Sequence, residues 1–211
     1  MNSICISKLI IPGTLVSFRL FKQSLWSLNI VTQCSEDSID LPLTPDIMKG
    51  CLFIDTYVDI KYNNEYFEYI ITGTISKIEL SGSPYIKVKI HGIVESLNHR
   101  IFQRLDVCLP ATLCSGNNSY FCKVSNLSLG GAAFLLDKKI PIKTSCEINI
   151  LLEDNSTVYA KGELLRTYKE NSLYKYSMMF TFMEEENSNR LYSFLYSLEN
   201  SYNLLRDKYL K

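Results

Sequence analysis

The chain has 211 residues, of which 46% are hydrophobic and 21% are charged, a composition that excludes global disorder because it supplies ample apolar surface to offset the loss of chain entropy. Lysine plus arginine equals aspartate plus glutamate at 22 each, so no strong overall field attracts DNA or anionic membranes. A site for an anion must therefore be a local cluster.

The first half of the chain is expected to be mostly β-structure. Its many β-branched and aromatic residues are interrupted by turn sequences such as Asn63-Asn64. Asparagines between two apolar runs are typical of a hairpin, here joining 51–62 to 66–79. The expected strands are 14–20, 25–33, 51–62, 66–79 and 85–94.

The second half of the chain shows six further short apolar runs. They predict strands at 106–114, 119–125, 131–136, 145–153, 157–168 and 173–182. Strands at this density are typical of small barrels or sandwiches, and the lack of alternating strands and helices disfavours a Rossmann-type nucleotide fold.

One helix is expected to end the chain, at about 187–209. Its apolar residues recur at helical spacing and form a single face: Leu191, Phe194, Leu195, Leu198, Tyr202 and Leu205. This face could cover its own barrel, which is the simpler interpretation, or pair with another copy of the chain. The sequence thus predicts an all-β fold with a C-terminal helix, built from two small β-barrel domains at 1–97 and 98–211.

Neither a membrane span nor a metal site is expected. The most apolar stretch, 9–18, contains Pro12 and Gly13 and is far shorter than the roughly 20 residues that cross a bilayer. The seven cysteines are odd in number and form no CxxC pair, which favours reduced, buried thiols. We therefore expect a cytoplasmic protein that is not an integral membrane protein.

Two short motifs carry the candidate chemistry. Arg100 and Arg104 lie four residues apart in the segment 98–104 between the two β-rich halves, and Asn126 and Ser128 precede a glycine pair between two apolar runs. Guanidinium groups can grip a phosphate, bind guanine or stack on a base. Two residues apart on a strand, Asn126 and Ser128 would point the same way and offer a neutral polar ledge.

The order of these motifs, RxxxR followed by [D/N]xSxxG, resembles the PilZ domain, a receptor for the bacterial second messenger cyclic di-GMP. The flanking segments 105–112, 130–134 and 161–166 resemble strands of that domain, and the resemblance covers 98–205. The wider layout resembles the YcgR-type flagellar-brake proteins. It implies an N-terminal split barrel at 1–97, then the arginine linker at 98–104, the PilZ barrel and the helix.

The resemblance implies cyclic di-GMP as the ligand. The implied ligand-binding residues are Arg100, Arg104, Asn126, Ser128 and Gly131, with His99, Gly130 and Arg166 as further candidates. Two positions depart from the family pattern. His99 stands where a basic residue is often found, which bears on ligand geometry or stoichiometry. Ser177 stands where the last strand often has glycine, and we expect this change to affect only packing.

The function implied by the resemblance is that of a non-catalytic effector that needs no cofactor or metal. Binding would order the linker and rearrange the two domains, and the output would be a protein partner, by analogy the flagellar motor or stator at the basal body. His91 and His99 lie in no HExxH motif, and the chain has no GxSxG or GxxxxGK[ST] motif, which argues against an enzyme.

Two other functions stay open at this point. One is a PilZ-fold adaptor in pilus or exopolysaccharide machinery that works without a nucleotide, although the intact arginine and Asn-Ser-Gly motifs argue against it. The other is binding of single-stranded nucleic acid by a small barrel, which the balance of 14 basic against 12 acidic residues over 98–211 disfavours.

Overall fold

The computed structural model describes residues 6–21, 23, 25–48, 51–170 and 172–210. The chain divides into two compact units, 1–99 together with 200–211, and 100–199. This division falls two residues beyond the expected boundary at 97/98, and it groups the last turns of the C-terminal helix with the first unit. Whether the segments 1–97 and 98–211 fold as separate domains stays a prediction.

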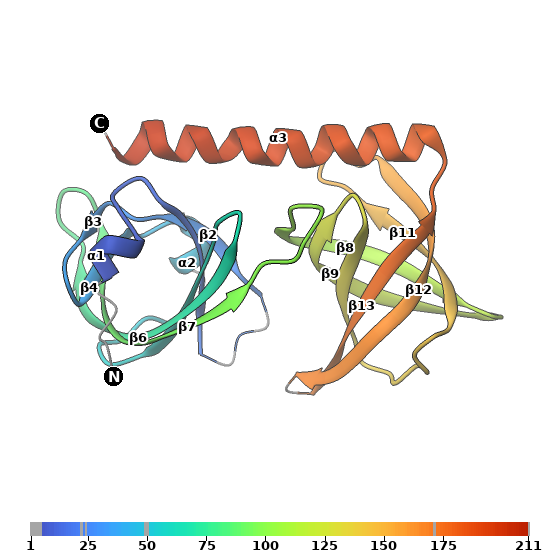
Figure 1. The fold of residues 1–211 in the computed structure, drawn as a ribbon, viewed down its shortest axis with the longest axis horizontal. Coiled ribbons are helices and arrows are strands. Elements are labelled where there is room, and N and C mark those ends of the chain that lie inside the picture. The colour runs from blue at the N-terminus through green and yellow to red at the C-terminus, as the bar shows by residue number, and fades with distance from the viewer. Residues whose placement is uncertain (1–5, 22, 24, 49–50, 171, 211) are drawn as a thin grey trace. The chain divides into compact units, whose positions relative to one another are not determined.

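The first unit is built on a curled antiparallel sheet of seven strands (Figure 1). The sheet wraps around an apolar core that includes Phe18, Ile60 and Ile71. Its spatial order is β2-β1-β5-β6-β7-β4-β3, and the short helices α1 (Ile6–Leu9) and α2 (Pro45–Met48) belong to the same unit. The strands are β1 (Leu15–Leu20), β2 (Ser27–Ile30), β3 (Gln33–Cys34), β4 (Ser38–Pro42), β5 (Tyr57–Asn63), β6 (Phe67–Glu79) and β7 (Tyr85–Leu97).

The predicted hairpin is confirmed as the β5–β6 pair. The Asn64 side-chain oxygen accepts hydrogen bonds from the backbone N–H groups of Tyr66 and Phe67, at 2.9 and 2.7 Å, and so shapes the turn. The first strand of the pair begins at Tyr57 rather than at residue 51, because a turn with Asp55 at positive φ precedes it. The expected strand at 25–33 is wrong in extent, since it splits into β2 and β3.

The second unit contains a closed barrel of six antiparallel strands, in the order β10-β13-β12-β11-β8-β9. All six expected strands of the second half are confirmed. Alternation explains the closure: in β11, for example, Cys146, Ile148 and Ile150 are buried while the residues between them face outward. The strands are β8 (Leu105–Ser115), β9 (Asn118–Ser128), β10 (Gly131–Leu136), β11 (Ser145–Leu151), β12 (Thr157–Glu170) and β13 (Leu173–Phe182).

The C-terminal helix α3 (Glu185–Tyr209) starts on the barrel. Tyr159 N of β12 donates to Asn187 Oδ1 at 2.9 Å, and Arg190 Nη1 donates to the carbonyl of Thr157 at 2.6 Å. Leu191 and Leu195 are buried one turn further on. The first half of the helix therefore packs against the unit from which it emerges. Of the helices described, none is long and apolar enough to cross a membrane.

The six described cysteines are free thiols, but their burial differs from the expectation. Cys122 and Cys146 are buried, and burial raises the pKa of Cys122 to about 12, so this thiol stays protonated and inert. Cys51 and Cys108 are exposed instead. The expectation of buried thiols is therefore wrong for these two. Cys5 lies outside the described residues.

Candidate functional site

The two sequence motifs meet at one end of the β8–β9 ladder. Leu105, the first residue of β8, pairs with Leu127 of β9, and Asp106 pairs with Asn126. Because the strands are antiparallel, Arg104 lies beside the end of β9 at Ser128. The backbone pairing thus brings the arginine linker and the Asn-Ser-Gly segment together.

Asn126 is oriented by a neighbour that the sequence reading did not single out. Its side-chain Nδ2 donates a hydrogen bond to Asp106 Oδ1 at 3.2 Å, and both residues are half-buried. An ionised carboxylate can only accept hydrogen bonds, so the NH₂ end of the Asn126 amide must face Asp106. The carbonyl oxygen of the amide therefore points away from Asp106. The side-chain amide of Asn126 is thus fixed in its orientation.

Ser128 and Gly131 shape the turn between β9 and β10. The buried Ser128 hydroxyl donates to the carbonyl of Gly131 at 3.2 Å, and the two residues face each other in the ladder. A Cβ atom on Gly131 would collide with the carbonyl oxygen of Met178 on β13. Glycine is therefore required here because the two backbones approach closely.

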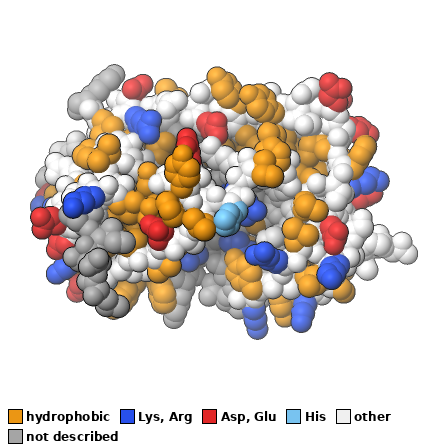
Figure 2. All heavy atoms as spheres, in the orientation of Figure 1, with side chains coloured by type: hydrophobic (Ala, Val, Ile, Leu, Met, Phe, Trp, Pro, Cys, Tyr) orange, Lys and Arg blue, Asp and Glu red, His pale blue; other side chains and the backbone are white. Residues whose placement is uncertain are grey.

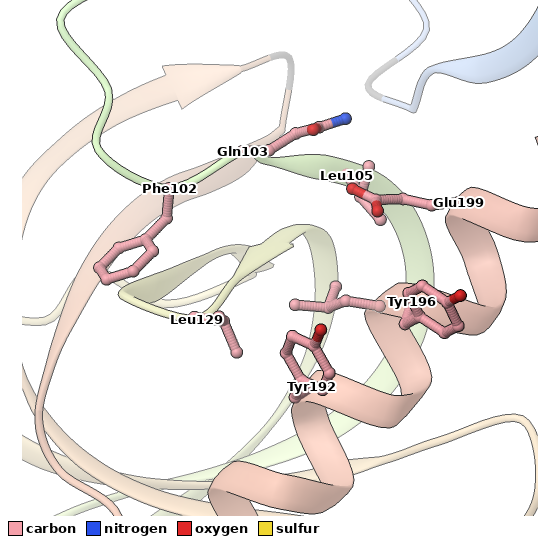
Figure 3. Close-up of a pocket in the computed structure, with 8 residues that line it drawn as sticks. Phe102, Gln103, Leu105, Leu129, Tyr192, Tyr196 and Glu199 are labelled. Atoms are coloured by element: carbon pink, nitrogen blue, oxygen red, sulfur yellow. The ribbon is translucent and has the colours of Figure 1, made fainter.

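Gly130 is constrained by the linker rather than by the backbone. A Cβ atom built on it would lie 2.8 Å from Cδ2 of Phe102, the residue midway between the two arginines. The Phe102 ring therefore rests directly on the turn. Its ring also lines a small pocket of about 110 Å³, with side chains from the linker, the turn and α3 (Figure 3).

A row of paired residues runs from Asn126 around the barrel to Arg166. Asn126 pairs with Ala133 of β10, Ala133 with Ser177 of β13, and Ser177 with Arg166 of β12. Paired residues share a face, and because Arg166 is exposed this is the outer face. Three strand spacings separate Asn126 from Arg166, about 14 Å.

The middle of this row is flat because Ala133 and Ser177 are small. Ser177 is half-buried and its side chain belongs to this outer strip, so the expectation that its change affects only packing stays a prediction. Register shifts adjoin the row in the β9–β10, β12–β13 and β8–β9 ladders. Bulges of this kind re-aim side chains at barrel rims and next to binding sites.

The remaining candidates are the two linker arginines and His99. Arg100 and Arg104 are both exposed and lie in the second unit with the rest of the site. His99 is exposed and is grouped with the first unit. Sequence reasoning missed Phe102, Asp106, Ala133 and Ser177 as parts of the site. Phe102 carried a local signal as a large apolar residue between two arginines, and Ser177 was noted only as a departure from the family pattern.

Because the chain as a whole carries no net charge, positive charge at the site must come from a few nearby side chains. Figure 2 shows basic and acidic side chains interspersed on the face that it draws. Within the described part of the chain, no group of three or more histidine, cysteine, aspartate or glutamate residues is placed to hold a metal ion. Exposed guanidinium groups beside a neutral amide and a flat strip suit an anionic ligand that carries planar rings.

Residues 98–197 match the family described as PilZ domain. No curated protein sequence matches the chain. Among solved structures, Escherichia coli YcgR in complex with c-di-GMP is 13% identical with a TM-score of 0.50, and the match covers 93% of this chain and 88% of YcgR. This likeness shows a shared fold.

Two further solved structures resemble the chain less closely. The Bacillus subtilis inhibitor of motility, MotI/DgrA, is 14% identical with a TM-score of 0.45, over 92% of this chain and 99% of that one. The K. pneumonia MrkH–c-di-GMP complex is 10% identical with a TM-score of 0.42, over 90% and 88%.

Proposed function

We propose that this chain, a PilZ-domain protein by its residues 98–197, is a non-catalytic effector that binds cyclic di-GMP. The observation that carries the proposal is the meeting of the two motifs: Arg104 lies beside the Asn126–Gly131 segment through the β8–β9 register. The shared fold with YcgR, a protein solved in complex with c-di-GMP, supports the same ligand.

The chemistry of the ligand matches the residues gathered here. Cyclic di-GMP carries two phosphodiester anions and two guanines, and arginine can fork a phosphate, bind guanine O6 and N7, or stack on the base. Four residues of extended linker span roughly 13 Å, so Arg100 and Arg104 can reach opposite edges of a folded ligand. Arg166 supplies a third guanidinium, across the flat strip formed by Ala133 and Ser177.

Asn126 is proposed to read the base. Its carbonyl oxygen, turned away from Asp106, can accept from the N–H groups of guanine. Ser128 and Gly131 act by holding the turn in shape, since the serine hydroxyl is already donated to the Gly131 carbonyl. Gly130 and His99 are weaker candidates for direct contact. The ligand needs no metal and no further cofactor.

The output is proposed to be a protein partner in motility, the flagellar motor or stator, with the protein acting in the cytoplasm at the basal body. This rests on the resemblance of the chain layout to flagellar-brake proteins. A nucleotide-independent adaptor is the alternative, and it gives no reason for Arg104 to lie beside the segment that holds the oriented Asn126. A measurement of cyclic di-GMP binding distinguishes the effector from the adaptor.

The first prediction concerns affinity. We expect the wild-type chain to bind cyclic di-GMP with a Kd near 1 μM or lower, about −8 kcal/mol or better. Replacing Arg100 or Arg104 by alanine should raise the Kd about tenfold to a hundredfold, because a charge-assisted hydrogen bond is worth ~1.5–3 kcal/mol. Titration calorimetry measures both values.

Lys139→Ala is the matched control for this experiment. Lys139 is exposed on the loop after β10, so the variant loses the same charge from the same unit and should bind like the wild type. Unchanged affinity in both arginine variants would show that cyclic di-GMP does not bind at this end of the barrel.

The second prediction concerns specificity. Cyclic di-AMP should bind at least about tenfold more weakly, because adenine offers an amino donor where guanine offers O6 and lacks the guanine N2 amino group. Asn126→Ala should reduce the ratio of the two affinities, because the oriented amide that would read the guanine is lost. Competition between the two dinucleotides measures the ratio, and equal affinities would show that only the phosphates are recognised.

The third prediction concerns coupling between the two domains. We propose that gathering the linker 98–104 around the ligand favours those domain arrangements that the gathered linker permits. The shift cannot exceed the differential affinity of the ligand for the two arrangements, about a few kcal/mol. Small-angle scattering of the full chain should therefore change on saturation with cyclic di-GMP. Superimposable curves would leave a receptor that is not an interdomain switch.

A further inference from the structure

We propose that Phe102 is a positioning residue for the binding of cyclic di-GMP: its ring docks on Gly130 and so holds both arginines of the linker at the site. The inference rests on the proposed function, because it concerns how that ligand is bound. It assigns a role to a side chain that lies between the motif arginines and is not itself one of the implied ligand contacts.

One side of the contact is the turn after β9. A Cβ atom on Gly130 would lie 2.8 Å from Cδ2 and 3.2 Å from Cε2 of Phe102, so the ring covers the bare face of this glycine. The neighbouring residue Ile101 is 91% exposed, whereas Phe102 is 46% exposed. The chain therefore turns the aromatic residue, rather than its neighbour, onto the barrel.

Phe102 is also one of the residues that line a pocket beside the first half of α3. The other residues that line this pocket include Leu129 of the turn and, on the helix, Tyr192, Leu195 and Tyr196 (Figure 3). The two tyrosine rings stack, with centroids 6.3 Å apart and planes at 10°. Since Asn187 and Arg190 bond the start of the helix to β12, the helix side of the pocket is fixed to the barrel.

The consequence for binding follows from chain geometry. Arg100 and Arg104 each lie two residues from Phe102, so their Cα atoms stay within about 7 Å of an anchored position. An anchored linker searches fewer conformations, and less conformational entropy is lost when the arginines close on a ligand. Loss of the anchor should therefore weaken binding even though both guanidinium groups remain.

The test is a set of titrations with cyclic di-GMP on the full chain. Phe102→Ala should raise the Kd about three- to tenfold, and Gly130→Ala should do the same, because its Cβ would displace the flexible ring without striking backbone. The double variant should bind no more weakly than the weaker single variant, since both changes remove one contact. Phe102→Leu, which keeps apolar bulk, should recover most of the affinity.

Phe121→Ala is the matched control. Phe121 is 75% exposed on β9, paired with Thr112 away from the turn, and it does not line the pocket. The same truncation on the same barrel should leave the Kd unchanged. Additive effects of Phe102→Ala and Gly130→Ala, or a Kd for Phe102→Ala equal to the wild type, would overturn the positioning role.

A second measurement needs no ligand. Trypsin should cut after Arg100 and Arg104 faster in Phe102→Ala and Gly130→Ala than in the wild type or Phe121→Ala, because the linker is released. Weaker binding with unchanged cleavage would mean that Phe102 contacts the ligand instead of anchoring the chain, and would overturn the inference. A wild-type chain that fails to bind cyclic di-GMP would overturn the proposed function, whereas wild-type binding with an unaffected Phe102→Ala overturns the positioning role alone.

Discussion

The pairing of Leu105 with Leu127 is the constraint on which the rest of the site depends. A shift of this register by one residue would turn Asn126 into the barrel and carry Leu127 onto the outer face. Because both leucines are buried, they fix the register of the two strands. The neighbouring polar pair, Asp106 and Asn126, is placed as a consequence. In this way the hydrophobic core of the barrel positions polar side chains on its outer face.

Adjacent glycines at the turn serve different purposes, and this difference explains how a rigid barrel can hold a linker. Gly131 lets β10 approach the backbone of β13, so it belongs to the barrel. Gly130 leaves room for the Phe102 ring, so it belongs to the linker contact. A side chain on the first would strain the sheet, whereas one on the second would displace only a ring. Within one turn, Gly131 is therefore required by the barrel, whereas Gly130 affects only the contact with the linker.

Much of the fold followed from the sequence, because local patterns determine it. Short apolar runs between turn residues identified the six barrel strands, and Asn64 marked the hairpin. The strand β4 was missed because its five residues include Asp40 and Pro42, which disguise a buried strand. The strip from Asn126 to Arg166 was also beyond reach, since it joins four strands whose registers depend on bulges. The motifs suggested the proposed ligand, while barrel closure determines which small residues form the strip between Asn126 and Arg166.

The central claim is that cyclic di-GMP is held between the linker and the Asn-Ser-Gly turn of the six-stranded barrel. Amide hydrogen exchange of the full chain, with and without saturating cyclic di-GMP, tests this claim most directly. The account predicts that peptides covering 98–104 and 126–131 gain protection, while the strand 145–151 exchanges as before. Saturation that leaves both of those segments unchanged, with protection appearing elsewhere in the chain, would contradict it.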